Sequence, residues 1–177
     1  AYGGLQFIRF NADGSVFVDP VICARDTYRE LNQRLLLFFT GQTRHARDVL
    51  ARQQEQTADH LDVLAELSGL ALEMRNLLSP SGDLDGFGRL LDCAWRAKKR
   101  LEASITNGCV DDIYDRGIEA GALGGKLLGA GNGGFVLFYC PPERQDALCA
   151  ALSSFTRVPF AMEPEGSKIA YLGGERL

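Results

Sequence analysis

Residues 121–139, GALGGKLLGAGNGGFVLFY, constrain the fold of this chain more than any other stretch. Glycine occupies seven of the first fourteen positions, and short apolar runs flank the glycine-rich centre. The pattern predicts a strand, a loop and a second strand. Glycine readily adopts positive φ, and a run of such residues can turn its N–H groups toward an anion. We therefore expect this loop to lie beside a phosphate.

The segment GAGNGG at residues 129–134 matches G-x-G-x-x-G, but its context excludes three familiar sites. A dinucleotide fingerprint leads into a helix, whereas FVLFY and Pro141 follow here and predict a strand. A P-loop has Ser or Thr after its lysine, and Leu127 follows Lys126. A protein kinase needs HRD and DFG motifs downstream, and neither follows here. Two interpretations stay open: a phosphate-related loop, or glycines that only permit close packing.

The composition is that of a globular protein with an apolar core. Hydrophobic residues make up 46% of the 177 positions, and the formal net charge of −4 gives no support for broad nucleic-acid binding. No apolar run approaches the roughly 20 residues that span a bilayer. The five cysteines lack a CxxC pair, and the two histidines lack the spacing of zinc ligands. We therefore expect a cytoplasmic protein with reduced thiols, no metal site in this chain, and no membrane or nucleic-acid partner.

The remaining patterns predict an α+β chain with strands at both ends and helices in the middle. Alternating residues at 5–10 and 16–21 predict a hairpin, and the apolar run at 35–41 predicts a buried strand. Further strands are expected at 157–163 and 168–172. Helices are expected at 24–33, 43–56, 58–78, 83–106, 110–120 and 143–155. This order favours a ferredoxin-like antiparallel sheet with helices on one face.

The glycine-rich segment resembles the third conserved motif of the GHMP kinases, which include galactokinase, homoserine kinase and mevalonate kinase. Flanking segments are similar to the branch of sugar kinases that act on D-glycero-D-manno-heptose 7-phosphate, with fucokinase-like proteins as relatives. These segments are AYGGLQFIRF, DGSVFVDPV, LLLFFTGQTRHA, AWRAKKRLEASITN and VDDIYDRGIEAGALGGKLLGAG. The resemblance divides the chain into a hairpin (residues 1–22) that completes a preceding kinase domain, and a GHMP C-terminal domain (residues 23–177).

The resemblance implies a magnesium-dependent transfer of phosphate from ATP to a sugar or sugar phosphate. For the heptose enzymes the acceptor is the anomeric hydroxyl, and the product serves GDP-heptose and surface-glycan synthesis. The family's ATP-gripping loop and catalytic aspartate have no counterpart in this sequence. We therefore expect no catalytic residue here, a missing N-terminal half as partner, and no activity from this chain alone. The alternatives are a fucokinase-like enzyme and a non-catalytic binding or regulatory module that retains the GHMP fold.

The resemblance also nominates site residues. The loop that supports ATP and the reacting phosphate would comprise Gly129, Ala130, Gly131, Asn132, Gly133 and Gly134, with Asn132 tolerating the positive φ of a more usual glycine. The substrate-binding candidates are Lys98, Lys99, Arg44, Lys126, Gly124 and Gly125.

Several charged and aromatic residues also fit a purely structural role. Lys98 and Lys99 also suit a solvated helix end, and Lys126 could point into a cleft or to solvent. Trp95 is expected in the core, and Asp111 is expected as a helix N-terminal charge.

Overall fold

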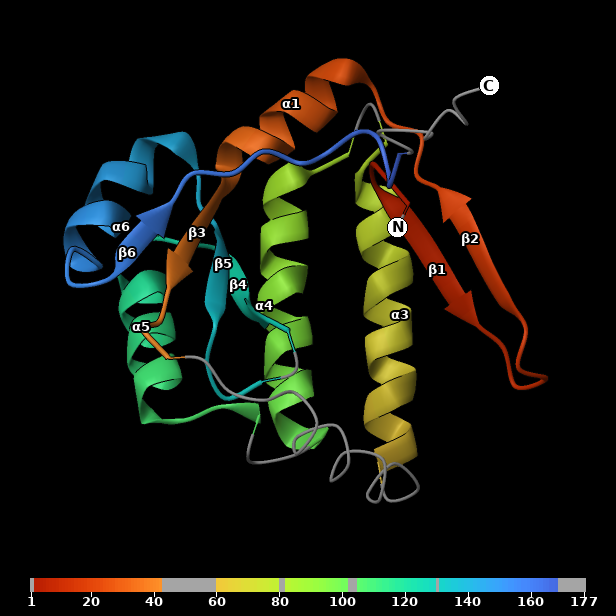
Figure 1. Ribbon diagram of the computed structural model, residues 1–177, viewed down its shortest axis with the longest axis horizontal. Helices are drawn as coiled ribbons and strands as arrows, with labels where there is room; N and C mark the ends of the chain where they lie inside the picture. Colours follow the sequence, from red (N-terminus) through yellow and green to blue (C-terminus); the bar gives the residue numbers. More distant parts are fainter. Residues whose placement is uncertain (1, 43–59, 80–81, 102–104, 130, 169–177) are drawn as a thin grey trace, which may run out of the picture.

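The computed structural model describes residues 2–42, 60–79, 82–101, 105–129 and 131–168 (Figure 1). Six strands and several helices follow one another along these residues. In order they are β1 (Gln6–Phe10), β2 (Val16–Pro20), α1 (Arg25–Arg34), β3 (Leu35–Phe39), α3 (Leu61–Leu77), α4 (Leu84–Leu101), α5 (Gly108–Glu119), β4 (Gly124–Leu128), β5 (Phe135–Tyr139), the 3₁₀ turn η3 (Pro142–Arg144), α6 (Gln145–Ala151) and β6 (Thr156–Val158).

The larger sheet has four strands in the order β4-β5-β3-β6, and every neighbouring pair is antiparallel. Helices α3, α4 and α5 connect β3 to β4, the glycine loop connects β4 to β5, and α6 leads to β6. This is the ferredoxin-like topology expected from the sequence, with extra helices in the first crossover. The α+β prediction is therefore confirmed.

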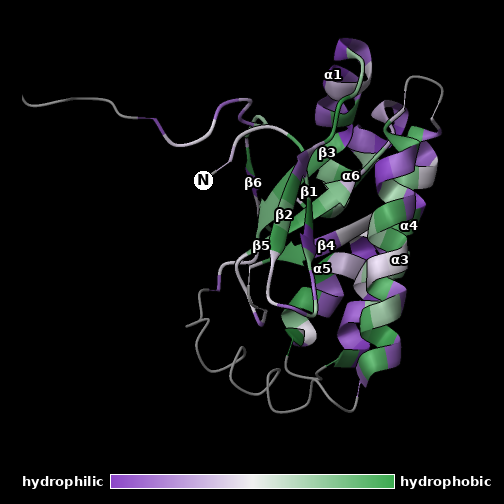
Figure 2. Cartoon of the chain, turned by 90° about the vertical axis from the view of Figure 1, so that its right-hand side faces the viewer, coloured by the Kyte–Doolittle hydropathy of each residue, from purple (hydrophilic) through white to green (hydrophobic). Residues whose placement is uncertain are grey.

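One face of this sheet forms the centre of the core. Phe38, Val136 and Phe138 alternate along β3 and β5 and are at most 1% exposed. They pack with Tyr114 of α5 and Leu148 of α6 in one apolar cluster. The helices lie on this side of the sheet (Figure 2). Figure 1 shows no described helix across the opposite face.

The last elements are shorter than the sequence pattern predicts. The helix expected at 143–155 is divided into η3 and α6 and ends at Ala151, before the turn that contains Ser153. The strand expected at 157–163 covers only Thr156–Val158. Pro159 follows directly, and it has no N–H with which to extend the ladder to β3. The helix expected at 43–56, and the strand at 168–172 beyond Lys168, lie outside the described residues.

Strands β1 and β2 form a separate two-stranded sheet. Phe7 faces α3, where the Arg75 guanidinium lies 4.4 Å from its ring centroid. Ile8, Phe10 and Val16 share the opposite face and are exposed, with Phe10 80% exposed. The hairpin thus carries an apolar outer face that the described residues leave uncovered.

All five cysteines are free. Burial raises the pKa of the Cys140 thiol to about 11. Among the described residues, no helix combines the length and hydrophobicity needed to cross a bilayer.

Candidate phosphate-binding site

The loop between β4 and β5 has an unusual run of left-handed backbone. Gly129, Gly131, Gly133 and Gly134 have φ values of 93°, 123°, 138° and 108°. Asn132 has φ of 59°, and it is the one residue other than glycine with positive φ among those that the structure describes. The expected tolerance of asparagine at this position is therefore confirmed. Ala130 lies outside the described residues.

The end of β3 fixes the second half of the loop. Thr40 is buried, and its hydroxyl donates to the Gly134 carbonyl at 3.0 Å and accepts from the Gly134 N–H at 3.1 Å. The Gly134 N–H also donates to the Gln42 carbonyl at 2.8 Å. Segments more than ninety residues apart in the sequence are thereby joined at one corner of the sheet.

Asn107 fixes the centre of the loop to helix α5. Its Oδ1 accepts from the N–H groups of Cys109 and Val110 and caps the helix. Its Nδ2 donates to Asn132 Oδ1 at 2.6 Å and to Gln42 Oε1 at 3.2 Å. The sequence indicated Asn107 only as a helix boundary. Its second contact joins residues 25 positions apart, which no local pattern reveals.

Substitution of Asn107 separates the two contacts. Asn107→Ala removes both the cap and the bond to Asn132, so we expect a loss of about 1–2 kcal/mol of unfolding free energy. Asn107→Ser retains a capping oxygen but is too short to reach Asn132, so the loss should be about half as large. Urea denaturation of the full-length protein measures both. Equal destabilisation by the two variants would contradict a separate bond to the loop.

Internal bonds limit what the loop can offer an anion. The N–H of Asn132 donates to the Ile105 carbonyl at 2.7 Å, and that of Gly134 is used as described above. The N–H groups of Gly131 and Gly133 make no hydrogen bond to a described residue. Hydrogen bonds therefore hold the loop in place, and it is not a nest in which every N–H is free. The unbonded N–H of Gly131 belongs to a half-buried residue, and that of Gly133 belongs to a buried one.

Gly124 and Gly125 have a packing explanation. A Cβ on Gly124 would lie 2.0 Å from the Gly88 carbonyl oxygen of α4, and one on Gly125 would lie 2.7 Å from the Leu137 carbonyl oxygen. Strand β4 thus approaches α4 backbone to backbone. Close packing explains these two glycines. The phosphate-related interpretation then applies to the glycines of the loop.

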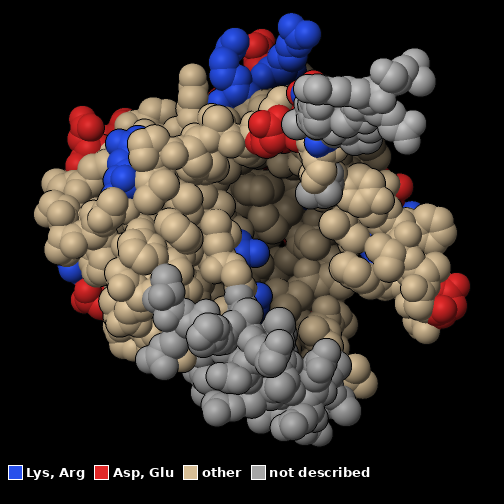
Figure 3. Space-filling model, in the orientation of Figure 1, with Lys and Arg blue, Asp and Glu red and all other residues tan. Residues whose placement is uncertain are grey.

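The structure separates the neighbouring lysines of α4. Lys98 lines a cavity together with Lys126 of β4. Lys99 instead contacts α5, where Nζ lies 3.3 Å from Asp111 Oδ1 and 5.8 Å from the Tyr114 ring centroid. Burial and the charge of Lys98 lower the pKa of Lys126. Figure 3 shows Lys or Arg atoms inside the hollow on this face of the molecule.

Two further residues lie where the sequence predicts. Trp95 is 1% exposed, so its expected place in the core is confirmed. Asp111 lies in the first turn of α5, also as expected. Arg44 lies outside the described residues.

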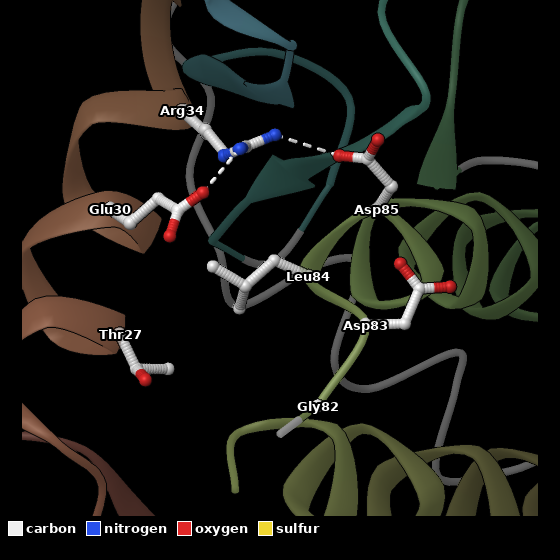
Figure 4. A pocket seen from close by; sticks show the side chains of 7 residues that line it. All are labelled: Thr27, Glu30, Arg34, Gly82, Asp83, Leu84 and Asp85. Atoms are coloured by element: carbon white, nitrogen blue, oxygen red, sulfur yellow. Dashed lines mark hydrogen bonds and ion pairs between the residues drawn. The ribbon is translucent and has the colours of Figure 1, made fainter. Parts of the chain in front are cut away.

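A second, acidic pocket lies between α1 and α4 (Figure 4). Arg34 occupies it with Glu30 and Asp85 on either side, and its Nη1 lies 2.8 Å from Asp85 Oδ1. Asp85 Oδ1 also accepts from the Tyr139 hydroxyl at 3.1 Å. Burial raises the pKa of Tyr139, which keeps the hydroxyl protonated as a donor. We interpret this cluster as a link between α1, α4 and β5.

Comparison with known proteins gives this fold its family. Residues 70–157, from α3 through β6, match the family described as GHMP kinases C terminal. This chain carries a GHMP kinase C-terminal domain. The chain is 31% identical over 153 residues to D-glycero-alpha-D-manno-heptose 7-phosphate kinase of Campylobacter jejuni, covering 85% of this chain and 45% of that enzyme. It is also 34% identical over 114 residues to L-fucokinase/L-fucose-1-P guanylyltransferase of Bacteroides fragilis, covering 62% and 12% of the two chains.

Solved structures agree with this family. A D-glycero-D-manno-heptose 1-phosphate kinase from Bacteroides thetaiotaomicron superposes with a TM-score of 0.65 at 26% identity, over 97% of this chain and 47% of that one. Mevalonate kinase of L. major gives a TM-score of 0.70 at 21% identity, over 94% and 51% of the chains, and supports the fold alone. The chain thus spans about half the length of these two structures.

The magnesium that the family resemblance implies has no evident site in this half. Among the described residues, no group of three or more His, Cys, Asp and Glu side chains is arranged to hold a metal ion.

Proposed function

We propose that this GHMP domain is the C-terminal half of an ATP-dependent sugar kinase. The observation that carries the proposal is the glycine loop, which Thr40, Gln42 and Asn107 hold rigidly at one corner of a GHMP fold. Phosphoryl transfer depends mainly on positioning and charge stabilisation. A loop held in this way, with the N–H of half-buried Gly131 unbonded, suits support of a nucleotide's phosphates from one wall of a cleft.

The other wall belongs to a partner segment in this proposal. Residues 1–22 would complete the kinase domain that precedes the GHMP domain, through the exposed apolar face that contains Ile8, Phe10 and Val16. That domain would supply the ATP-gripping loop, the metal ligands and the catalytic aspartate. The 45% coverage of the Campylobacter enzyme supports this division of labour.

The substrate we propose is D-glycero-D-manno-heptose 7-phosphate, phosphorylated at its anomeric hydroxyl in the cytoplasm for GDP-heptose synthesis. The 31% identity to the Campylobacter enzyme supports this choice. The neighbouring ammonium groups of Lys98 and Lys126 also favour an acceptor that already carries a phosphate. Fucose is the second candidate because the fucokinase of Bacteroides fragilis matches at 34% identity, but fucose has no phosphate for these lysines.

Sugar-dependent ADP release by the full-length protein tests the function. With ATP and magnesium we expect turnover of heptose 7-phosphate and little turnover of fucose. Residues 1–177 alone should turn over neither sugar. Failure to release ADP with any sugar would favour a non-catalytic binding module, and turnover by residues 1–177 alone would refute the assignment of catalysis to the other half.

A further inference from the structure

A cavity of about 200 Å³ lies where α3, α4 and β4 meet. Most of its wall is apolar and comes from one stripe of each helix: Leu67, Ala71 and Met74 of α3, and Leu91, Ala94 and Trp95 of α4. The two charged residues that line it are Lys98 of α4 and Lys126 of β4. The close contact of Gly88 with Gly124 brings α4 and β4 together, and this contact sets the two lysines beside one cavity.

These lysines differ from the other basic residues at this end of α4. Arg96 pairs with Asp92, Lys99 with Asp111, and Arg100 with Glu66. Neither Lys98 nor Lys126 has an ion pair or hydrogen bond to a described residue. Burial and, after it, the like charge of Lys98 lower the pKa of Lys126. An anion in the cavity would balance the two positive charges.

The indole of Trp95 belongs to the apolar part of this wall. Trp95 lines the same cavity and is 1% exposed. Its Nε1–H is buried and has no hydrogen-bond partner among the described residues. Because no solvent reaches this nitrogen, it offers no donor to a ligand in the cavity, and the donors there are the two lysines.

We propose that Lys98 and Lys126 bind the phosphate that the sugar substrate already carries. The inference rests on the sugar-kinase function proposed above and assigns the non-reacting end of the substrate to this domain. Two ammonium charges balance a phosphate dianion, and both ammonium groups can donate to its terminal oxygens. A carboxylate would leave one charge unmatched.

The cavity is at a suitable distance from the glycine loop, so that one site can bind the substrate's own phosphate and the other the transferred phosphate. Lys126 precedes the first residue of the glycine loop, Gly129, by three positions along β4 and the loop entrance. At about 3.3 Å per residue, the subsite lies roughly 10 Å from the loop that we assign to the transferred phosphate. One sugar unit can bridge such a gap, with its hydroxyl toward the loop and its phosphate toward the lysines.

Kinetics of the full-length protein test the subsite against its alternatives. Lys98→Gln and Lys126→Gln remove one positive charge each. We expect both variants to raise KM for heptose 7-phosphate about 10- to 100-fold, with KM for ATP changed less than about twofold. Turnover of the unphosphorylated heptose should be unaffected. Arg89→Gln, which removes an exposed ion pair of α4, is the matched control with unchanged KM. A rise in KM for ATP with none for the sugar phosphate would assign the lysines to the nucleotide and overturn the proposal.

A binding measurement keeps the proposal testable without catalysis. Trace acetylation with peptide mass spectrometry reports the accessibility of Lys126, and exposed Lys168 serves as internal reference. We expect heptose 7-phosphate, and inorganic phosphate at higher concentration, to slow acetylation of Lys126 relative to Lys168, whereas the unphosphorylated heptose does not. Protection of Lys126 without ADP release would support the phosphate subsite and refute the kinase function. ADP release without protection of Lys126 would support the kinase function and refute the subsite.

Discussion

Gly124→Ala is expected to destabilise the GHMP domain by about 3 kcal/mol or more. The added Cβ would lie 2.0 Å from the Gly88 carbonyl oxygen and 2.7 Å from the Asp92 nitrogen. Both atoms belong to the backbone of α4, so no side-chain rotation relieves the clash, and the helix must move away from β4. The urea midpoint of the full-length protein measures the loss.

Gly69→Ala is the matched control for this substitution. Gly69 lies within α3, and nothing lies within 4 Å of the position that its Cβ would occupy. Alanine there should stabilise the helix by about 0.5–1 kcal/mol. If Gly124→Ala were as harmless as Gly69→Ala, the close approach of β4 to α4 would be wrong.

Gly131→Ala is expected to lower kcat of the full-length kinase about 100-fold while leaving most of its stability. Gly131 has φ of 123°, which alanine seldom adopts, and its added Cβ would lie 3.0 Å from Ile105 Cα. The loop must therefore shift, and a displacement of about 1 Å at a phosphate site costs about 100-fold in rate. Steady-state kinetics with ATP and heptose 7-phosphate measure kcat.

Gly14→Ala tests whether backbone strain alone explains such a loss. Gly14 also has positive φ, 83°, but it lies in the turn between β1 and β2, and its Cβ would meet nothing within 4 Å. We expect about 1 kcal/mol of destabilisation and an unchanged kcat. A similar fall in kcat for both variants would show that the glycine loop has no special part in the reaction.

Local patterns predicted most of the elements because the physical causes were local. Glycine and proline bounded the segments, the apolar run at 35–39 formed β3, and helical spacing indicated α3 and α4. The errors arose where the end of an element depends on its neighbours. Strand β6 stops at Val158 because Pro159 cannot donate to the adjacent strand.

The sequence by itself determined that a glycine-rich loop joins two strands of an α+β domain, because glycine's backbone freedom and β-strand alternation are properties of neighbouring residues. Only the tertiary structure decided the surroundings of that loop and the choice between adjacent lysines. Successive helix residues point about 100° apart, so Lys98 and Lys99 face different elements. Which of them meets Lys126 depends on the packing of α4 against β4 at Gly88 and Gly124. That contact joins segments far apart in the chain, and spacing alone does not specify it.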